Sequence, residues 1–81
     1  MGMKKVYVII YEELYSDGSY SSGISYAFDS FDKAKKMLQE IKEEERENYY
    51  SDWDLTEKED EILFDIGDEY TKYEIIEMDV R

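Results

Sequence analysis

Carboxylates are the functional groups with which this chain could do chemistry. Its 81 residues include 22 Asp and Glu against 10 Lys and Arg, a formal net charge of −12, and contain neither Cys nor His. Thiolate and imidazole chemistry and the usual zinc sites are therefore excluded. Acid–base catalysis by carboxylates needs a shielded cleft that shifts their pKa values, and so short a chain has little room for both a core and a deep cleft. We therefore expect no enzymatic activity and no cofactor.

One stretch has the spacing of a calcium loop. Asp52, Asp54 and Thr56 alternate as the first three ligands of such a loop would. Calcium loops then need Gly at the sixth position and a bidentate Glu at the twelfth. This chain has Glu57 and Leu63 at those two positions. The stretch therefore predicts a solvated acidic turn, and no metal site is expected.

The excess of acidic groups decides the class of partner. Binding of DNA or RNA requires basic groups that displace counterions from phosphates, and anionic membranes attract basic segments, so neither is an expected partner. A basic surface of another protein is what such a field attracts. The chain has no Cys, no signal peptide and no apolar stretch near the roughly 20 residues of a membrane span. We expect a cytoplasmic protein.

The acidic residues gather in one part of the chain, since the segment from Glu40 to Glu61 holds eleven acidic and three basic residues. Like charges four residues apart on a helix, such as Glu40 and Glu44, cost about 0.2–0.5 kcal/mol, and local rules are commonly broken at functional sites. The expected partner-binding surface comprises Glu40, Glu43, Glu44, Glu47, Tyr49, Tyr50, Asp52, Asp54, Glu57, Glu59 and Asp60. Its two tyrosines would serve as anchors, whereas Trp53 is expected in the core. The other interpretation, a solvated face whose charge serves solubility, stays open.

Two strands joined by a tight turn are predicted at the start of the chain. Residues 4–15 and 20–28 are rich in apolar and aromatic side chains, and Asp17-Gly18 between them is typical of a two-residue hairpin turn. That register would gather on one face Tyr7, Ile9, Tyr11, Tyr15, Tyr20, Ile24, Tyr26 and Phe28. One helix can cover only one face of these strands, so we expect either that the segment Tyr49–Leu55 folds over the other face or that this tyrosine-rich face meets a second copy of the chain or a partner.

A helix is predicted to follow over roughly residues 30–47. Asp29 or Ser30 can cap its first free amides. An apolar stripe at helical spacing comprises Phe31, Ala34, Leu38 and Ile41. This stripe predicts which side of the helix packs against the sheet.

The last third of the chain predicts one short helical turn and two strands. Thr56-x-x-Glu59 has the form of a capping box, which predicts a short second helix near 56–61. Helix and strand compete over 61–66, where the alternation of Ile62, Phe64 and Ile66 favours a strand. Residues 70–80 complete the sheet. The expected fold is α+β, an antiparallel β-β-α-β-β sheet with one main helix on a face, in a single domain over 3–81 that follows a two-residue cloning remnant.

Part of this pattern resembles a known group of proteins. The residues concerned are Lys4-Lys5-Val6-Tyr7-Val8-Ile9, Asp17-Gly18 and Phe28-Asp29-Ser30-Phe31-Asp32-Lys33-Ala34. They resemble short proteins of phages and prophages of low-GC bacteria, over about the first half of the chain. In size and acidity the chain is also similar to phage-borne inhibitors of nucleic-acid enzymes, such as anti-CRISPR proteins and the uracil-DNA glycosylase inhibitor. This second resemblance rests on composition and carries over no binding residue.

Together, the charge and the resemblance favour a phage- or mobile-element-encoded inhibitor. Its acidic surface would mimic DNA and occupy the basic groove of a bacterial nucleic-acid-handling protein, for example a CRISPR effector. The alternative is a self-associating structural or regulatory module that forms a homodimer through the tyrosine-rich sheet face. A trap for a nucleotide signal, with a basic pocket of Lys4, Lys5 or Lys72, is the least favoured because the overall charge would repel an anion.

Overall fold

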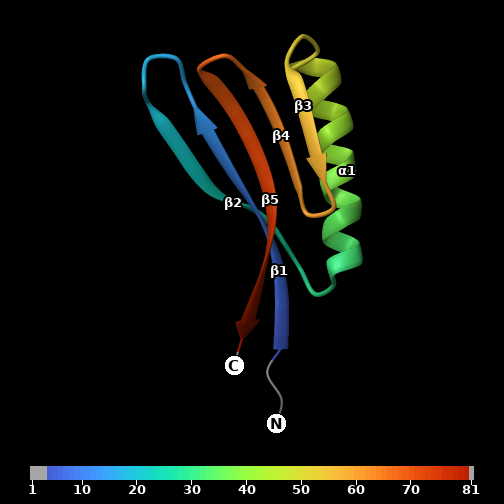
Figure 1. The fold of residues 1–81 in the computed structure, drawn as a ribbon. Helices are drawn as coiled ribbons and strands as arrows, with labels where there is room; N and C mark the ends of the chain where they lie inside the picture. Colours follow the sequence, from blue (N-terminus) through green and yellow to red (C-terminus); the bar gives the residue numbers. More distant parts are fainter. Residues whose placement is uncertain (1–3, 81) are drawn as a thin grey trace.

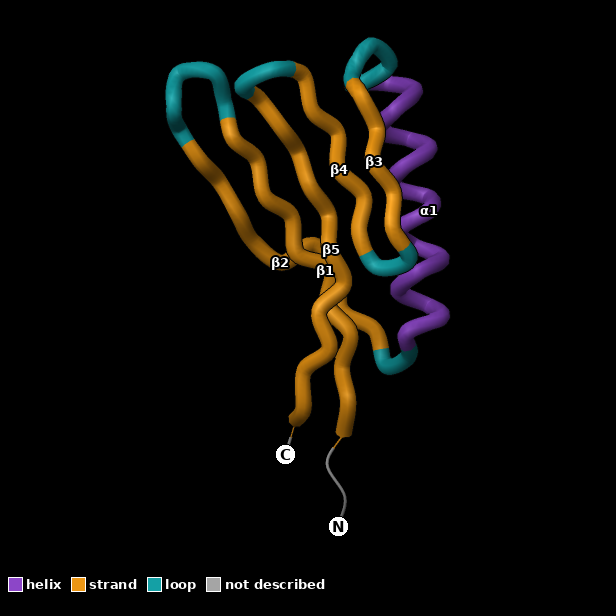
Figure 2. Tube along the Cα trace, in the orientation of Figure 1, coloured by secondary structure: helices purple, strands orange, loops and turns teal. Residues whose placement is uncertain are grey.

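The computed structural model describes residues 4–80, which form a five-stranded antiparallel sheet with one helix on a face (Figures 1 and 2). The expected start at Met3 and the last residue, Arg81, lie outside the described residues. In chain order the elements are β1 (Lys4–Leu14), β2 (Tyr20–Phe28), α1 (Phe31–Asn48), β3 (Asp54–Lys58), β4 (Glu61–Ile66) and β5 (Glu69–Val80). The strand order across the sheet is β2-β1-β5-β4-β3, so the strand that comes last in the chain lies in the middle.

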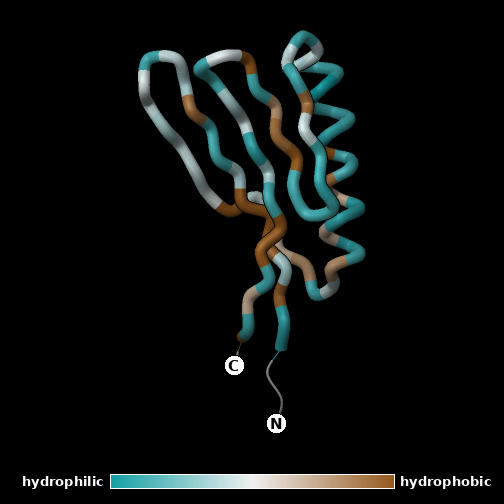
Figure 3. Tube along the Cα trace, viewed as in Figure 1, coloured by the Kyte–Doolittle hydropathy of each residue, from teal (hydrophilic) through white to brown (hydrophobic). Residues whose placement is uncertain are grey.

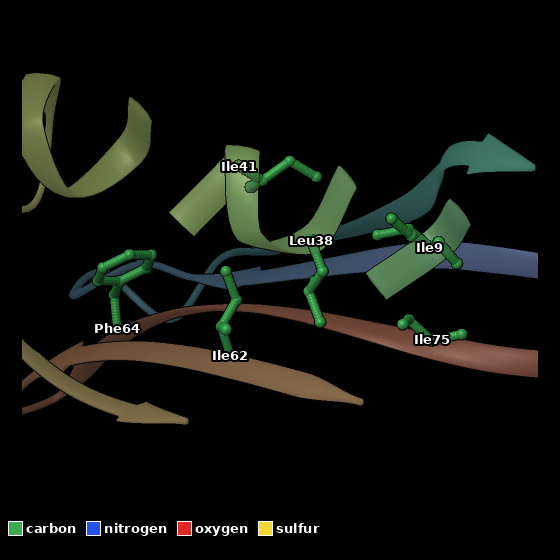
Figure 4. Packing of buried hydrophobic residues seen from close by; sticks show 7 residues of the cluster. Ile9, Leu38, Ile41, Ile62, Phe64 and Ile75 are labelled. Atoms are coloured by element: carbon green, nitrogen blue, oxygen red, sulfur yellow. The ribbon is translucent and has the colours of Figure 1, made fainter. Parts of the chain in front are cut away.

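α1 begins at the predicted cap and buries the predicted stripe. The Ser30 hydroxyl accepts a hydrogen bond from the Lys33 amide at 3.1 Å, which satisfies one of the free N–H groups of the first turn. Ala34, Leu38 and Ile41 are the buried residues of the helix. They pack on side chains from β1, β4 and β5, as Figure 4 shows, namely Ile9, Ile62, Phe64 and Ile75. This contact holds the helix on one face of the sheet.

The predicted short helix near 56–61 is wrong, because residues 54–58 form a fifth strand. β3 pairs antiparallel with β4, which places Leu55 opposite Phe64 and at the edge of the core. A helix started at Thr56 would consist of charged residues with no apolar stripe to bury, whereas the strand buries part of Leu55 and pairs its backbone. The strand predicted for 61–66 is confirmed. The sequence order is therefore β-β-α-β-β-β.

The hairpin between β1 and β2 forms, but with a different turn. Tyr15 and Ser19 close a three-residue loop in which Gly18 has φ +91°. The pairing near the turn is therefore one residue away from the predicted register, with Leu14 opposite Tyr20. An extra residue in β2 between Tyr26 and Ile24 restores the predicted pairs farther on, including Ile9 with Tyr26.

This shift divides the predicted tyrosine-rich face between the two sides of the sheet. Tyr7 lies under α1, where its ring contacts Phe31 edge to face with centroids 5.9 Å apart. Ile9 and Phe28 lie under the same helix. Ile24 pairs with Ile10 on the opposite side of the sheet. A second copy therefore could not cover this set of side chains as one face, because α1 already occupies part of it.

The sheet face away from α1 is not covered by a helix within the described residues. Its centre carries an ion-pair cluster, in which the Lys72 ammonium lies 3.3 Å from Glu12 and 3.7 Å from Glu74. Burial alone would lower the pKa of Lys72, but the hydrogen bond and charge of Glu12 outweigh it and raise that pKa. Figure 1 shows that β1 and β5 continue past their neighbours as a two-stranded ribbon at the end of the molecule where both described termini lie. In residues 4–80, no helix has the length and apolar character needed to cross a membrane.

Candidate protein-binding surface

The second half of α1 carries four exposed carboxylates. Because the buried stripe fixes how the helix is turned, all four are exposed, with Glu43 and Glu47 on the outer side and Glu40 and Glu44 on the flank toward β2. None of the four forms an ion pair with a basic side chain of the described residues. Figure 3 shows this part of α1 as largely hydrophilic. These four carboxylates are here called the acidic face, and the exposed Arg46 lies beside Glu43 and Glu47.

The charges at the C-terminal end of α1 oppose the helix dipole. Arg46 is the basic residue of the last turn, against Glu44 and Glu47 beside it. A helix C-terminus is partially negative and favours cations, so carboxylates there destabilise it. The amides of Tyr49 and Tyr50 both donate to the Glu45 carbonyl at 2.9 Å, which partly offsets this cost by closing the last turn. The sequence therefore keeps negative charge where local stability argues against it.

Two of the predicted acidic residues do not join this face. The Lys42 ammonium and the Gln39 amide both donate to Glu57 at 2.9 Å, and Lys35 lies 3.2 Å from Glu59. The hydrogen bond from Lys42, followed by that from Gln39, lowers the pKa of Glu57. These side chains connect the inner flank of α1 to the β3–β4 hairpin, where Glu57 and Glu59 each lie beside a lysine.

Three further predicted acids are exposed at the ends of β3. Asp52 and Asp54 lie in and after the loop that leaves the C-terminal end of α1, close in the chain to the acidic face. Asp60 lies at the other end of β3, in the turn to β4, and its carbonyl accepts the Ile75 amide at 2.8 Å. The structure therefore places Asp52 and Asp54 beside the end of the acidic face and Asp60 away from it.

The two predicted anchors occupy different environments. Tyr50 packs into the core edge, stacked on Phe64 with ring centroids 5.0 Å apart and edge to face with Trp53 at 4.6 Å. Its hydroxyl accepts a hydrogen bond from the buried Thr71 hydroxyl at 3.1 Å. Tyr49 is 70% exposed at the helix end. Tyr49 is thus available to a partner, whereas Tyr50 and Trp53 close the core.

A groove of about 620 Å³ runs between α1 and the strands beside it. Its lining comprises Ser25, Tyr26, Met37, Glu40, Ile41, Glu44, Glu45 and Tyr73. Three carboxylates and two aromatic rings around an apolar floor suit a cationic side chain, since the rings attract cations as well. This groove continues the acidic face toward β2.

Glu45 and Tyr73 hold one wall of the groove in place and were not among the predicted residues. The Tyr73 hydroxyl donates to Glu45 Oε1 at 2.8 Å. Burial and then this hydrogen bond raise the pKa of Tyr73. A sequence signal existed, because Glu45 follows Leu38 and Ile41 at helical spacing and so falls on the inward stripe.

Comparisons of the chain with family models, with curated proteins and with solved structures find no match. Among residues 4–80, no group of three or more Asp and Glu side chains is arranged to hold a metal ion.

Proposed function

We propose that this protein binds the basic groove of a bacterial nucleic-acid-handling protein through the acidic face and thereby inhibits it, as a phage- or mobile-element-encoded inhibitor would. A CRISPR effector in the host cytoplasm is one such target. The observation that carries the proposal is the sorting of charge on α1. Lys35 and Lys42 turn inward to Glu59 and Glu57, while the carboxylates of the acidic face have no basic partner among the described residues.

The spacing of the acidic face supports mimicry of a phosphate row. Glu40 and Glu47 are seven residues apart, which is about 10.5 Å along a helix axis. Four charges over that length give one charge per about 3.5 Å, close to the about 3.4 Å per phosphate along one strand of DNA. A basic groove that recognises DNA would meet a similar linear charge density on this helix.

The exposed Tyr49 and the groove supply contacts that charge alone does not. Tyrosine is enriched among the residues that dominate binding energy. The groove beside Glu40 and Glu44 can accept an Arg or Lys side chain from the partner, placed near the Tyr26 ring. Binding is therefore expected to be strong at low salt and to weaken as salt screens the charges.

Neutralising the acidic face tests the proposal. The test variant replaces all four carboxylates by amides: Glu40→Gln, Glu43→Gln, Glu44→Gln and Glu47→Gln. This changes the net charge from −12 to −8. It also removes the like-charge pairs Glu40–Glu44 and Glu43–Glu47, each of which costs about 0.2–0.5 kcal/mol. It should fold at least as stably as the parent. Tagged protein is incubated with nuclease-treated bacterial lysate, washed at low and then at high salt, and the retained proteins are identified by mass spectrometry. The parent should retain a nucleic-acid-binding protein that duplex DNA competes off, and the variant should lose it.

A second variant with the same net charge is the control. This control removes four exposed carboxylates outside the acidic face, by the substitutions Asp32→Asn, Asp60→Asn, Asp68→Asn and Asp79→Asn. It should retain the partner and still inhibit that partner's action on nucleic acid. Equal loss in both variants would show a general effect of charge, and retention by the acidic-face variant would refute the proposal.

A further inference from the structure

The two edge strands of the sheet, β2 and β3, differ in how well they are protected from pairing with strands of other molecules. β3 has five residues, of which Asp54, Glu57 and Lys58 are charged, and ion pairs connect its end to α1. β2 has nine residues and no charged side chain, in a chain whose residues are 40% charged. Charges on an edge strand prevent it from pairing with other strands, and β2 lacks them.

The hydrogen-bond pattern shows which groups of β2 face outward. Residues of an antiparallel strand alternate between those bonded to the neighbour and those directed away from it. The Tyr15 amide donates to the Ser19 carbonyl at 2.9 Å, so Ser19 faces β1. The next outward positions are therefore Tyr20, Ser22 and Ile24, whose N–H and C=O groups point away from the sheet. Another strand presents its own donors and acceptors at the same spacing, so this segment can take part in edge-to-edge strand pairing.

We propose that Tyr20–Ile24 pairs antiparallel with the same segment of a second copy, about a two-fold axis at Ser22. This register places Ser22 opposite Ser22 of the second copy and Tyr20 opposite Ile24 of the second copy. All three outward residues then meet outward residues, which gives three complete hydrogen-bonded pairs. The two sheets become one continuous sheet, and the two-fold axis closes the assembly at a dimer.

The side chains of this segment fit a second copy of themselves. Tyr20 and Ile24 are 55% and 64% exposed on the sheet face away from α1. An aromatic and a β-branched side chain directly opposite each other form a favourable cross-strand pair, and the dimer contains two such pairs. A charged partner strand would bury unpaired charge against neutral β2, whereas β2 itself brings none.

The rest of the molecule favours the edge over the open sheet face. Face-to-face association would bury the Glu12–Lys72–Glu74 cluster, which carries excess negative charge in both copies. The start of β2 lies across the sheet from α1, as Figure 1 shows, so the acidic faces stay apart in the edge-paired dimer. The extra residue, Ser25, interrupts the edge beyond Ile24 and limits pairing to this segment.

Sedimentation equilibrium of the full chain tests the dimer independently of the proposed function. The parent, of 9.8 kDa, should approach twice that mass as its concentration rises. Salt should strengthen this association, because it screens repulsion between two molecules of net charge −12. Binding of a basic partner shows the opposite dependence on salt. A mass of one chain at every salt and protein concentration would overturn the proposal while leaving the acidic face untouched.

Ser22→Pro tests the edge itself. Proline removes an outward N–H and leaves in place the groups that bond β1. The variant should therefore show a cooperative thermal unfolding transition, as a folded protein does, and remain a monomer. A folded variant that still dimerises would exclude this edge.

Cross-linking decides the register, including the case in which the proline variant does not fold. The chain has no Cys, so Ser22→Cys provides one thiol per molecule. A short bismaleimide should convert Ser22→Cys to a covalent dimer, and should leave Thr56→Cys, exposed on the other edge strand, a monomer. Equal yields from both variants, or no product from Ser22→Cys, would rule out the proposed pairing.

Discussion

The hydrogen bond between Tyr73 and Glu45 joins the middle strand of the sheet to α1. A hydrogen bond to a charged group contributes about 1.5–3 kcal/mol, and partial exposure of Glu45 reduces this. We expect Tyr73→Phe to lower the free energy of unfolding by about 1–2 kcal/mol, measured by urea denaturation at neutral pH. Tyr49→Phe, at an exposed position, should change it little and is the matched control.

The same bond gives stability a dependence on alkaline pH. Because folding raises the pKa of Tyr73, the bond's contribution is complete below about pH 10, the ordinary tyrosine value, and is lost as pH rises above it. Tyr73→Phe should therefore flatten the fall in stability above that pH. An unchanged alkaline profile in the variant would show that the hydroxyl is not held as the structure places it.

The exposed carboxylates of α1 were predictable from sequence, but their partners were not. Helical spacing places Glu40, Glu43, Glu44 and Glu47 outside the apolar stripe, and this requires no knowledge of the rest of the fold. Whether Glu57 adds to that surface depends on β3 running beside Lys42, a contact between residues fifteen positions apart. Local pattern contains no information on that contact.

At the scale of elements, the turn between β1 and β2 depends on the backbone conformation of one glycine, Gly18. Gly18 has φ +91°, and a Cβ built there meets nothing within 4 Å, so the cost of a side chain is conformational alone. We expect Gly18→Ala to destabilise the protein by about 1–2 kcal/mol in urea denaturation. Gly18→Asn should cost less, since Asn visits left-handed conformations more readily. Equal stability of the alanine variant and the parent would mean that the hairpin uses another turn.

The same turn explains why register was harder to predict than strand identity. Asp17-Gly18 serves equally in a two-residue turn and in the last positions of a three-residue turn, and the two differ by one residue in every pair. The extra residue in β2 then restores the pairs near Tyr26, an irregularity for which apolar alternation gives no signal. β3 was missed because five residues with one apolar side chain resemble a turn more than a strand.

At the scale of the whole molecule, net charge opposes compactness. The folded chain measures 48 × 24 × 17 Å, so many of its like charges lie within a few Debye lengths, about 10 Å each at 0.1 M salt. Exposed ion pairs contribute about 0.2–1 kcal/mol each, and salt weakens both these pairs and the net repulsion. With a charge of −12, we expect repulsion to dominate and Tm to rise with NaCl, by about 4–8 °C for each kcal/mol of relief.

The variant with a neutralised acidic face sharpens this prediction. At a net charge of −8 it should show a smaller rise of Tm with NaCl than the parent, when both are measured by differential scanning calorimetry over a series of NaCl concentrations. A fall of Tm with NaCl in the parent would mean that the pairs between α1 and β3 outweigh repulsion.

The position of β5 between β1 and β4 bears on how the chain reaches this fold. β1–β2 and β3–β4 are local hairpins that can form early, but each leaves an inner edge open until β5 is synthesised. β5 also brings Ile75 and Thr71 to the core, so before β5 is in place α1 can pack on only part of the sheet surface that it finally covers. Joining the hairpins requires β1 and β5 to meet from opposite ends of the chain, a non-local step of the kind that slows folding. Nascent chains would thus carry two unpaired inner edges, and the pace of β5 insertion would determine how long these edges remain open to wrong pairing.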